Sequence, residues 1–91
     1  MHDALESLAA DPALAPDAQG ERWDRVSRVQ WILDHLPSPY GDALEWKYVE
    51  GLSAEEIGQR LRVSATAAHS LVARARRAFR AEYEAIAQGQ T

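Results

Sequence analysis

Residues 51–79 read GLSAEEIGQRLRVSATAAHSLVARARRAF and contain two signals for the start of a helix. Ser53 precedes Glu56 by three residues, which is the spacing at which a serine and a glutamate cap a helix reciprocally. Ser64 is placed to cap a second helix with its hydroxyl. The stretch therefore predicts two helices that are separated by a tight turn.

Hydrophobic residues recur through both segments at helical spacing. The apolar faces consist of Ile57 and Leu61 in the helix predicted over 54–62, and of Ala68, Val72, Ala75 and Phe79 in the helix predicted over 65–86. Leu52 and Val63 each precede a cap and are expected to pack on the helical turn that follows. A short helix, a tight turn and a longer helix form a helix-turn-helix, here over 53–80, whose second helix can enter the major groove of DNA.

Two further helices are predicted upstream, over 22–36 and 39–50. Apolar residues at helical spacing mark the first of them: Val26, Val29, Leu33 and Leu36. Ser38 is expected to cap the second helix with Pro39 at its first position, where no amide hydrogen is needed. Gly51 is expected to end that helix.

Composition limits the classes of function. The chain has 91 residues, 46% of them hydrophobic, which suits one small domain. It has no cysteine, so disulfides, thiolate chemistry and cysteine-bound zinc are excluded. Because no long apolar run or signal-like start occurs, we expect a cytoplasmic protein with no membrane span. Residues 1–20, rich in Ala, Pro and Asp, are predicted to be a flexible linker or tail, and 21–88 to be the domain.

Charge is distributed unevenly along the chain, which has a net charge of -4. Residues 1–50 contain ten Asp and Glu against four Lys and Arg, whereas residues 51–91 contain four against six. All six of these arginines fall between 60 and 80, where no acidic residue occurs. The two halves are therefore expected to bind different partners. The arginines are suited to contact phosphates. The alternative is that the arginine-rich helix only presents a solvated face.

Residues 36–80 resemble region 4 of bacterial sigma factors, in particular the extracytoplasmic-function group. The matching motifs are Leu36-Pro37, Y-V-E-G-L-S over Tyr48 to Ser53, Glu56-Ile57, Leu61, Val63-Ser64, Ser70 and Arg74-Ala75-Arg76. This resemblance covers about half of the chain and implies an all-α, four-helix sigma region 4 type domain with a helix-turn-helix. It also implies three partners: double-stranded promoter DNA at the upstream, minus-thirty-five element, the β-flap of core RNA polymerase, and an anti-sigma factor.

Two sets of candidate residues follow from the pattern and the resemblance together. The candidate DNA-binding residues are Arg62, Ser64, Thr66, His69, Ser70, Arg74, Arg76 and Arg77. The candidate polymerase-binding residues lie on the first two predicted helices and are Leu33, Leu36, Leu44 and Trp46.

The chain departs from the family pattern at two places. Arg62 stands where the family usually has glycine before the apolar residue of the turn, which costs about 1 kcal/mol if the backbone there is left-handed. Over residues 67–72 the usual T-V-K-S-R-L is replaced by A-A-H-S-L-V, so His69 takes the place of the lysine. The short side chains in this segment offer few bidentate contacts to bases, whereas the arginines beyond it still favour general affinity for DNA.

The sequence is compatible with two other classes of binding protein and carries no signal for an enzyme. The three histidines lack ligand spacing and no Ser, His and acid cluster occurs, so we expect no metal, no cofactor and no enzyme activity. A LuxR-like helix-turn-helix regulator shares the E-G-L-S and E-I motifs. A region-4-like protein-interaction module that binds polymerase or an anti-sigma protein without reading a promoter is a second alternative. Nothing in the first 35 residues resembles the upstream region 2 of this sigma group, so we expect an excised domain or a lone regulator.

Overall fold

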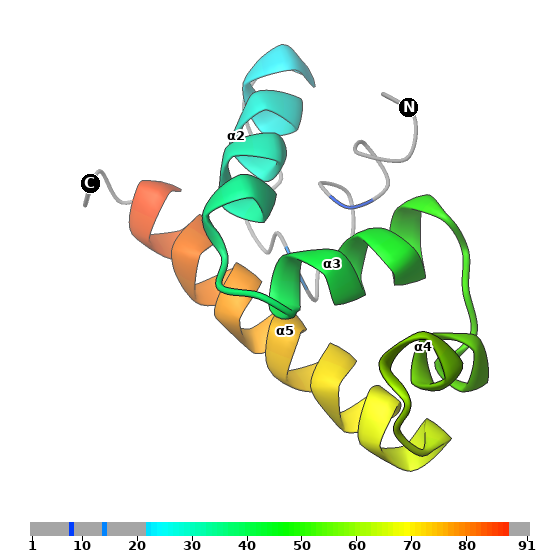
Figure 1. The fold of residues 1–91 in the computed structure, drawn as a ribbon. Coiled ribbons are helices and arrows are strands. Elements are labelled where there is room, and N and C mark those ends of the chain that lie inside the picture. The colour runs from blue at the N-terminus through cyan, green and yellow to red at the C-terminus, as the bar shows by residue number, and fades with distance from the viewer. Residues whose placement is uncertain (1–7, 9–13, 15–21, 88–91) are drawn as a thin grey trace.

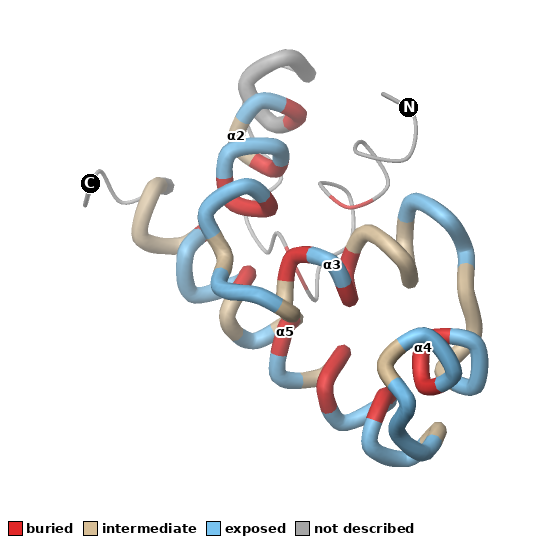
Figure 2. The backbone as a smooth tube through the Cα atoms, viewed as in Figure 1, coloured by how far each residue is buried: buried red, intermediate tan, exposed pale blue. Residues whose placement is uncertain are grey.

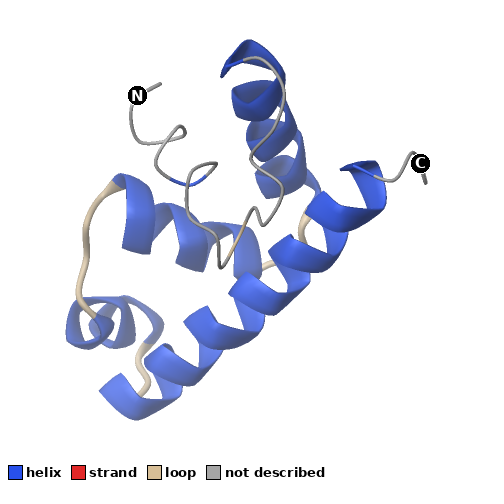
Figure 3. Cartoon of the chain, turned by 180° about the vertical axis from the view of Figure 1, so that it is seen from behind, coloured by secondary structure: helices blue, strands red, loops and turns tan. Residues whose placement is uncertain are grey.

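The computed structural model describes Leu8, Leu14 and residues 22–87, and every regular element among them is helical (Figures 1 and 3). The elements are the α-helices α2 (Arg22–His35), α3 (Tyr40–Leu44), α4 (Ala54–Leu61) and α5 (Ala65–Ala87), and the π-helix η1 (Glu45–Val49). The prediction of an all-α domain is confirmed. No helix in the described part of the chain has the length and apolar character needed to cross a membrane.

Helix α5 runs the length of the domain, with α2, α3 and α4 following one another along it (Figure 1). Its buried positions form one stripe on the side that faces the other helices (Figure 2). This stripe contains the four predicted residues Ala68, Val72, Ala75 and Phe79, all of which are buried. The helical spacing read from the sequence therefore assigns the core side of α5 correctly.

One core cluster joins α2 and α3 to the C-terminal half of α5. Its buried members are Leu8, Leu14, Val26, Val29, Ile32, Leu33, Leu44, Ala75, Phe79 and Tyr83. The predicted linker or tail over 1–20 therefore contributes two fully buried leucines to this core. The other residues of that segment, and the predicted domain limits Glu21 and Gln88, lie outside the described residues.

A second cluster joins the helix-turn-helix to α3. It consists of Ala43, Ile57, Ala68, Leu71 and Val72. Leu52 and Leu61 pack against it while partly buried, so Leu52 covers the cluster of Ile57 as the sequence predicts. Phe79 belongs to the other cluster, so the last two helices share a smaller core than their apolar stripe suggests.

The start of α3 corrects the prediction for Ser38 and Pro39. Helix α3 begins at Tyr40, and Pro39 rather than Ser38 occupies its N-cap position, without a side-chain cap. The reason is a turn in which the Tyr40 N–H donates to the Pro37 carbonyl at 2.8 Å, so that Pro39 becomes the first carbonyl of the helix, accepting from Ala43 at 2.9 Å. The Ser38–Pro39 peptide bond is cis.

The single helix predicted over 39–50 is instead two elements, α3 and η1. The Glu50 N–H donates to the Glu45 carbonyl at 3.0 Å, five residues back, which widens the last turn into a π-helix. Gly51 follows with φ of 72°, a left-handed conformation that glycine adopts without steric penalty. The element ends where the sequence predicts, but with a wider turn whose side chains Trp46 and Tyr48 reach toward the helix-turn-helix.

Candidate nucleic-acid interface

Helix α4 begins with the capping box that the sequence predicts. The Glu56 N–H donates to Ser53 Oγ at 3.2 Å, and the Ser53 N–H donates to Glu56 Oε1 at 2.9 Å. The hydrogen bond from the Ser53 backbone is the main reason that the pKa of the Glu56 carboxyl lies below its usual value. The box fixes the residue at which the helix-turn-helix starts.

The turn between α4 and α5 is closed by two backbone hydrogen bonds to the end of α4. The Val63 N–H donates to the Gly58 carbonyl at 2.9 Å, and the Arg62 N–H donates to the Gln59 carbonyl at 3.4 Å. This pair of bonds is a Schellman motif, which requires a left-handed residue after the helix. Arg62 is that residue, with φ of 60° and ψ of 44°, so the condition for the cost of replacing the family glycine is met.

Gly58 is required by the same turn, and sequence reasoning missed it. A Cβ atom at this position would lie 2.7 Å from the Val63 carbonyl oxygen, because the turn folds back against the helix. A glycine inside a short amphipathic helix is the signal that could have revealed the close approach. The prediction that Val63 packs on α5 is wrong, because Val63 is 45% exposed and belongs to neither core cluster.

Helix α5 starts at the predicted cap, where the Ala67 N–H donates to Ser64 Oγ at 3.0 Å. Thr66 and Ser70 lie exposed on the first turns, opposite the buried stripe, and His69 is exposed beside that stripe. Further along this side a depression of about 460 Å³ is lined by Ala67, Ser70, Ala73, Arg74 and Arg77. Because most of these side chains are small, the edge of a nucleic-acid groove can approach the helix closely here.

The six arginines between 60 and 80 differ in their partners. Arg60 Nη2 lies 3.1 Å from Glu50 Oε1, and Arg80 Nε lies 3.0 Å from Glu84 Oε1. Both ion pairs are exposed and stabilise the fold by only about 0–1 kcal/mol, but each carboxylate repels a phosphate that approaches its arginine. These two cations are therefore poor candidates for phosphate contact.

Three of the predicted DNA-binding arginines form no ion pair within the described residues. Arg62, Arg74 and Arg77 are exposed and have no ion-pair or hydrogen-bond partner among the residues that the structure describes. Arg76 differs from them, since it is half-buried and its Nε donates to the Tyr48 hydroxyl at 2.7 Å. All eight DNA-binding candidates thus lie on the helix-turn-helix. Two of them also have a partner inside the domain, since Ser64 caps α5 and Arg76 is bound by Tyr48.

The predicted polymerase-binding set needs a larger correction. Leu44 is fully buried and Leu33 is 6% exposed, so Leu44 offers a partner no surface and Leu33 offers only a small one. Both face the core because the stripe that suggested them is the inner face of α2 and α3. Leu36 and Trp46 are half-buried, and Trp46 also stacks under the Arg60 guanidinium at 5.4 Å.

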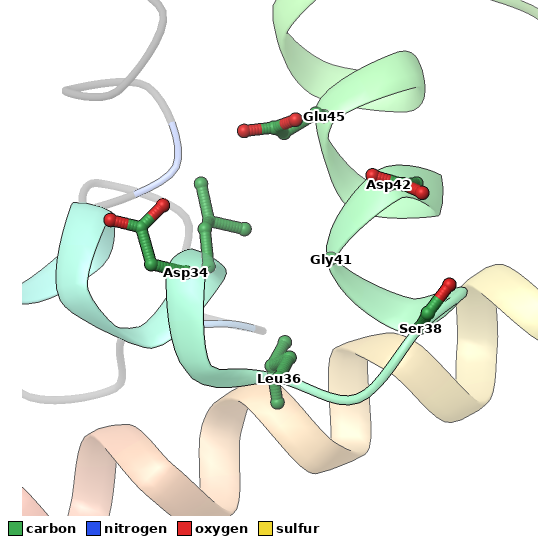
Figure 4. A pocket seen from close by; sticks show the side chains of 7 residues that line it. Asp34, Leu36, Ser38, Gly41, Asp42 and Glu45 are labelled. Carbon is green, nitrogen blue, oxygen red and sulfur yellow. The ribbon is translucent and has the colours of Figure 1, made fainter.

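A small acidic pocket lies on the α2 and α3 side of the domain (Figure 4). It has a volume of about 260 Å³ and is lined by Leu33, Asp34, Leu36, Ser38, Gly41, Asp42 and Glu45. Burial raises the pKa of the Glu45 carboxyl, and the nearby carboxylates of Asp42 and Asp34 raise it further. The negative potential of these carboxylates disfavours DNA on this side of the domain. The acidic side therefore differs in its expected partner from the side that carries the arginines of α5.

Within residues 22–87 and the two described leucines, no group of three or more His, Asp or Glu side chains could hold a metal ion. The three carboxylates of the acidic pocket are thus not arranged as a ligand set.

The fold and the exposed arginines define a helix-turn-helix domain of the kind that binds nucleic acid through its second helix. The chain matches the family described as Sigma-70, region 4, over residues 28–79, and belongs to that family. This match confirms the resemblance seen in the motifs and does not support the LuxR-like alternative. No curated protein and no solved structure matches the chain.

Proposed function

We propose that this domain binds double-stranded promoter DNA at the upstream element and docks on core RNA polymerase, so that it serves transcription initiation in the cytoplasm by binding rather than by catalysis. The observation that carries the DNA-binding role is a set of three exposed arginines on the helix-turn-helix that have no ion-pair partner within the described residues: Arg62, Arg74 and Arg77. Each phosphate that they neutralise releases counterions, which makes binding favourable and dependent on salt.

The experiment that tests this role compares two double variants with the same change in formal charge. Arg74→Ala with Arg77→Ala removes two unpaired cations, and the slope of log affinity against log salt should fall by about 1.8, since each phosphate contact contributes about 0.9. Arg60→Ala with Arg80→Ala removes two cations that are already in ion pairs, so the slope should stay close to that of the wild type. Slopes that fall equally in the two double variants would show that only net charge matters. Slopes that stay at the wild-type value in both would make these arginines a solvated face.

Base recognition by this helix is proposed to depend on apolar contact more than on hydrogen bonds. The exposed first turns of α5 contain no Arg, Lys, Asn or Gln, the side chains that contact a base edge in pairs of hydrogen bonds. Thr66, Ala67 and Ala73 can instead contact the methyl group of thymine. Replacing thymine by uracil in a bound duplex removes only that methyl, so a loss of affinity on this exchange supports the proposal and an unchanged affinity contradicts it.

Polymerase docking is proposed for the side of α2 and α3, where Leu36 is half-buried and the acidic pocket repels DNA, whereas Trp46 lies against Arg60 of the helix-turn-helix. Asp42 is exposed and lines the pocket, so Asp42→Lys reverses a charge there without touching the core. Capture of core RNA polymerase should weaken in this variant while the salt slope of DNA binding stays unchanged. Full capture by Asp42→Lys would move the docking surface elsewhere.

A protein-interaction module without promoter reading is the second candidate, favoured by the absence of paired hydrogen-bond donors on the first turns of α5. In that case the domain binds polymerase or an anti-sigma protein, and affinity for a promoter duplex equals affinity for the same duplex with scrambled sequence. A clear preference for the promoter duplex excludes this candidate.

A further inference from the structure

Arg76 and Tyr48 form a contact between η1 and the middle of α5. The Arg76 Nε donates to the Tyr48 hydroxyl at 2.7 Å, and the guanidinium carbon lies 5.7 Å from the centre of the Tyr48 ring. The two residues are 28 positions apart in the sequence, so only the folded chain brings them together. Both side chains are half-buried, which restricts the conformations that the arginine can adopt.

The Tyr48 hydroxyl differs from the partners of Arg60 and Arg80 because it is neutral. Glu50 and Glu84 offset the charge of the arginines that they bind, whereas a hydroxyl holds the guanidinium and leaves its full positive charge. Arginine has five N–H donors in one plane, and the hydrogen bond to Tyr48 uses the one on Nε. The two terminal amino groups therefore stay available to the oxygen atoms of a phosphate.

Arg76 also lies on a side of α5 that borders the proposed reading face. It follows His69 by seven residues, which is close to two helical turns, so the two side chains project from the same side of the helix. His69 is exposed at the start of α5 and Arg76 is anchored further along. A DNA strand that passes the first turns of α5 on this side would reach Arg76 next.

We propose that Tyr48 is a positioning residue for Arg76, which it holds ready to contact a DNA phosphate. This inference rests on the proposed DNA-binding function of the helix-turn-helix. A free arginine side chain loses rotamer freedom when it binds, and Tyr48 restricts that freedom before DNA arrives. Tyr48 thus strengthens binding without touching the nucleic acid.

The test measures DNA affinity over a range of KCl concentrations for the wild type, Tyr48→Phe, Arg76→Ala and the double variant, with a short fluorescein-labelled duplex of mixed sequence. Tyr48→Phe keeps the ring and removes the hydroxyl, so affinity should fall about two- to tenfold while the salt slope stays the same, because the charge of Arg76 remains. Arg76→Ala should lower the slope by about 0.9. In the Arg76→Ala background, Tyr48→Phe should have no further effect.

A matched control is Tyr83→Phe, which removes the hydroxyl from another arginine–tyrosine pair, that of Arg28 and Tyr83 at 3.3 Å. Arg28 lies on α2, outside the helix-turn-helix, so this variant should leave DNA affinity unchanged. The inference is overturned if Tyr48→Phe binds as tightly as the wild type, if its loss persists in the Arg76→Ala background, or if Tyr83→Phe weakens binding equally. A wild type without salt-dependent DNA binding overturns the proposed function itself, and this inference with it.

Discussion

Replacing Arg62 by glycine is expected to stabilise the domain and to weaken its binding to DNA at the same time. The residue has φ of 60° at the position where the Schellman motif of α4 needs a left-handed backbone. An L-residue in that conformation costs about 1–2 kcal/mol, whereas glycine adopts it freely. Glycine also raises the entropy of the unfolded chain, which offsets about 0.5–1 kcal/mol of the gain.

The net gain in the free energy of unfolding is therefore about 0.5–1 kcal/mol. For a domain of this size, a gain of about 1 kcal/mol raises Tm by about 4–8 °C, so Arg62→Gly should melt about 2–8 °C above the wild type. The side chain is exposed and unpaired within the described residues, so the variant should also lose one phosphate contact. The salt slope of DNA binding should fall by about 0.9.

Two further variants separate the backbone effect from the charge effect. Arg62→Lys keeps the charge and the strain, so its Tm and salt slope should match those of the wild type. Gln59→Gly places glycine at an exposed helical position of α4, where it should destabilise the domain by about 0.5–1 kcal/mol. Thermal melting by circular dichroism would refute the strain argument if Arg62→Gly melted at or below the wild-type temperature, and an unchanged salt slope would remove Arg62 from the DNA contacts.

Two other expectations concern the core and the acidic pocket. Leu14→Ala should lower the free energy of unfolding by about 2–5 kcal/mol in a urea titration, because Leu14 is fully buried, and an unchanged midpoint would place it outside the core. The raised pKa of Glu45 means that the folded state binds its proton more tightly than the unfolded state, so stability falls as pH rises through the folded pKa. Glu45→Gln should therefore raise Tm at neutral pH, with the gain vanishing in acid, and a gain that persists in acid would contradict this.

The sequence predicted the features of this fold that depend on neighbouring residues. The capping box of Ser53 and Glu56 and the cap at Ser64 each arise within one helical turn. Local hydrogen-bonding chemistry and steric limits on the backbone suffice to predict such features. The same holds for the core stripe of α5, because helical spacing alone decides which side chains share a face.

Features that depend on distant segments escaped prediction. Nothing local indicates that Leu8 and Leu14 enter the core, since the segment around them lacks a helical pattern. Leu33 and Leu44 belong to apolar stripes at helical spacing. Spacing alone does not show whether such a stripe faces solvent or packs against another helix, and here both residues are buried. The π-helix turn of η1 interrupts a pattern that is compatible with one continuous α-helix, so only the folded chain shows where Trp46 and Tyr48 point.

The arginines show most clearly why composition could not define the site. In the sequence the six residues between 60 and 80 are equivalent cations, with no acidic residue among them. Their partners come from before and after that interval: Glu50 for Arg60, Tyr48 for Arg76 and Glu84 for Arg80. Glu50 and Glu84 offset the charge of their arginines, whereas Tyr48 leaves the charge of Arg76 intact. The cationic surface offered to a phosphate therefore depends on residues at the end of η1 and at the end of α5. A count of arginines on α5 overstates that surface, whereas the pairing predicts that Arg62, Arg74, Arg76 and Arg77 set the salt dependence and that Arg60 and Arg80 do not.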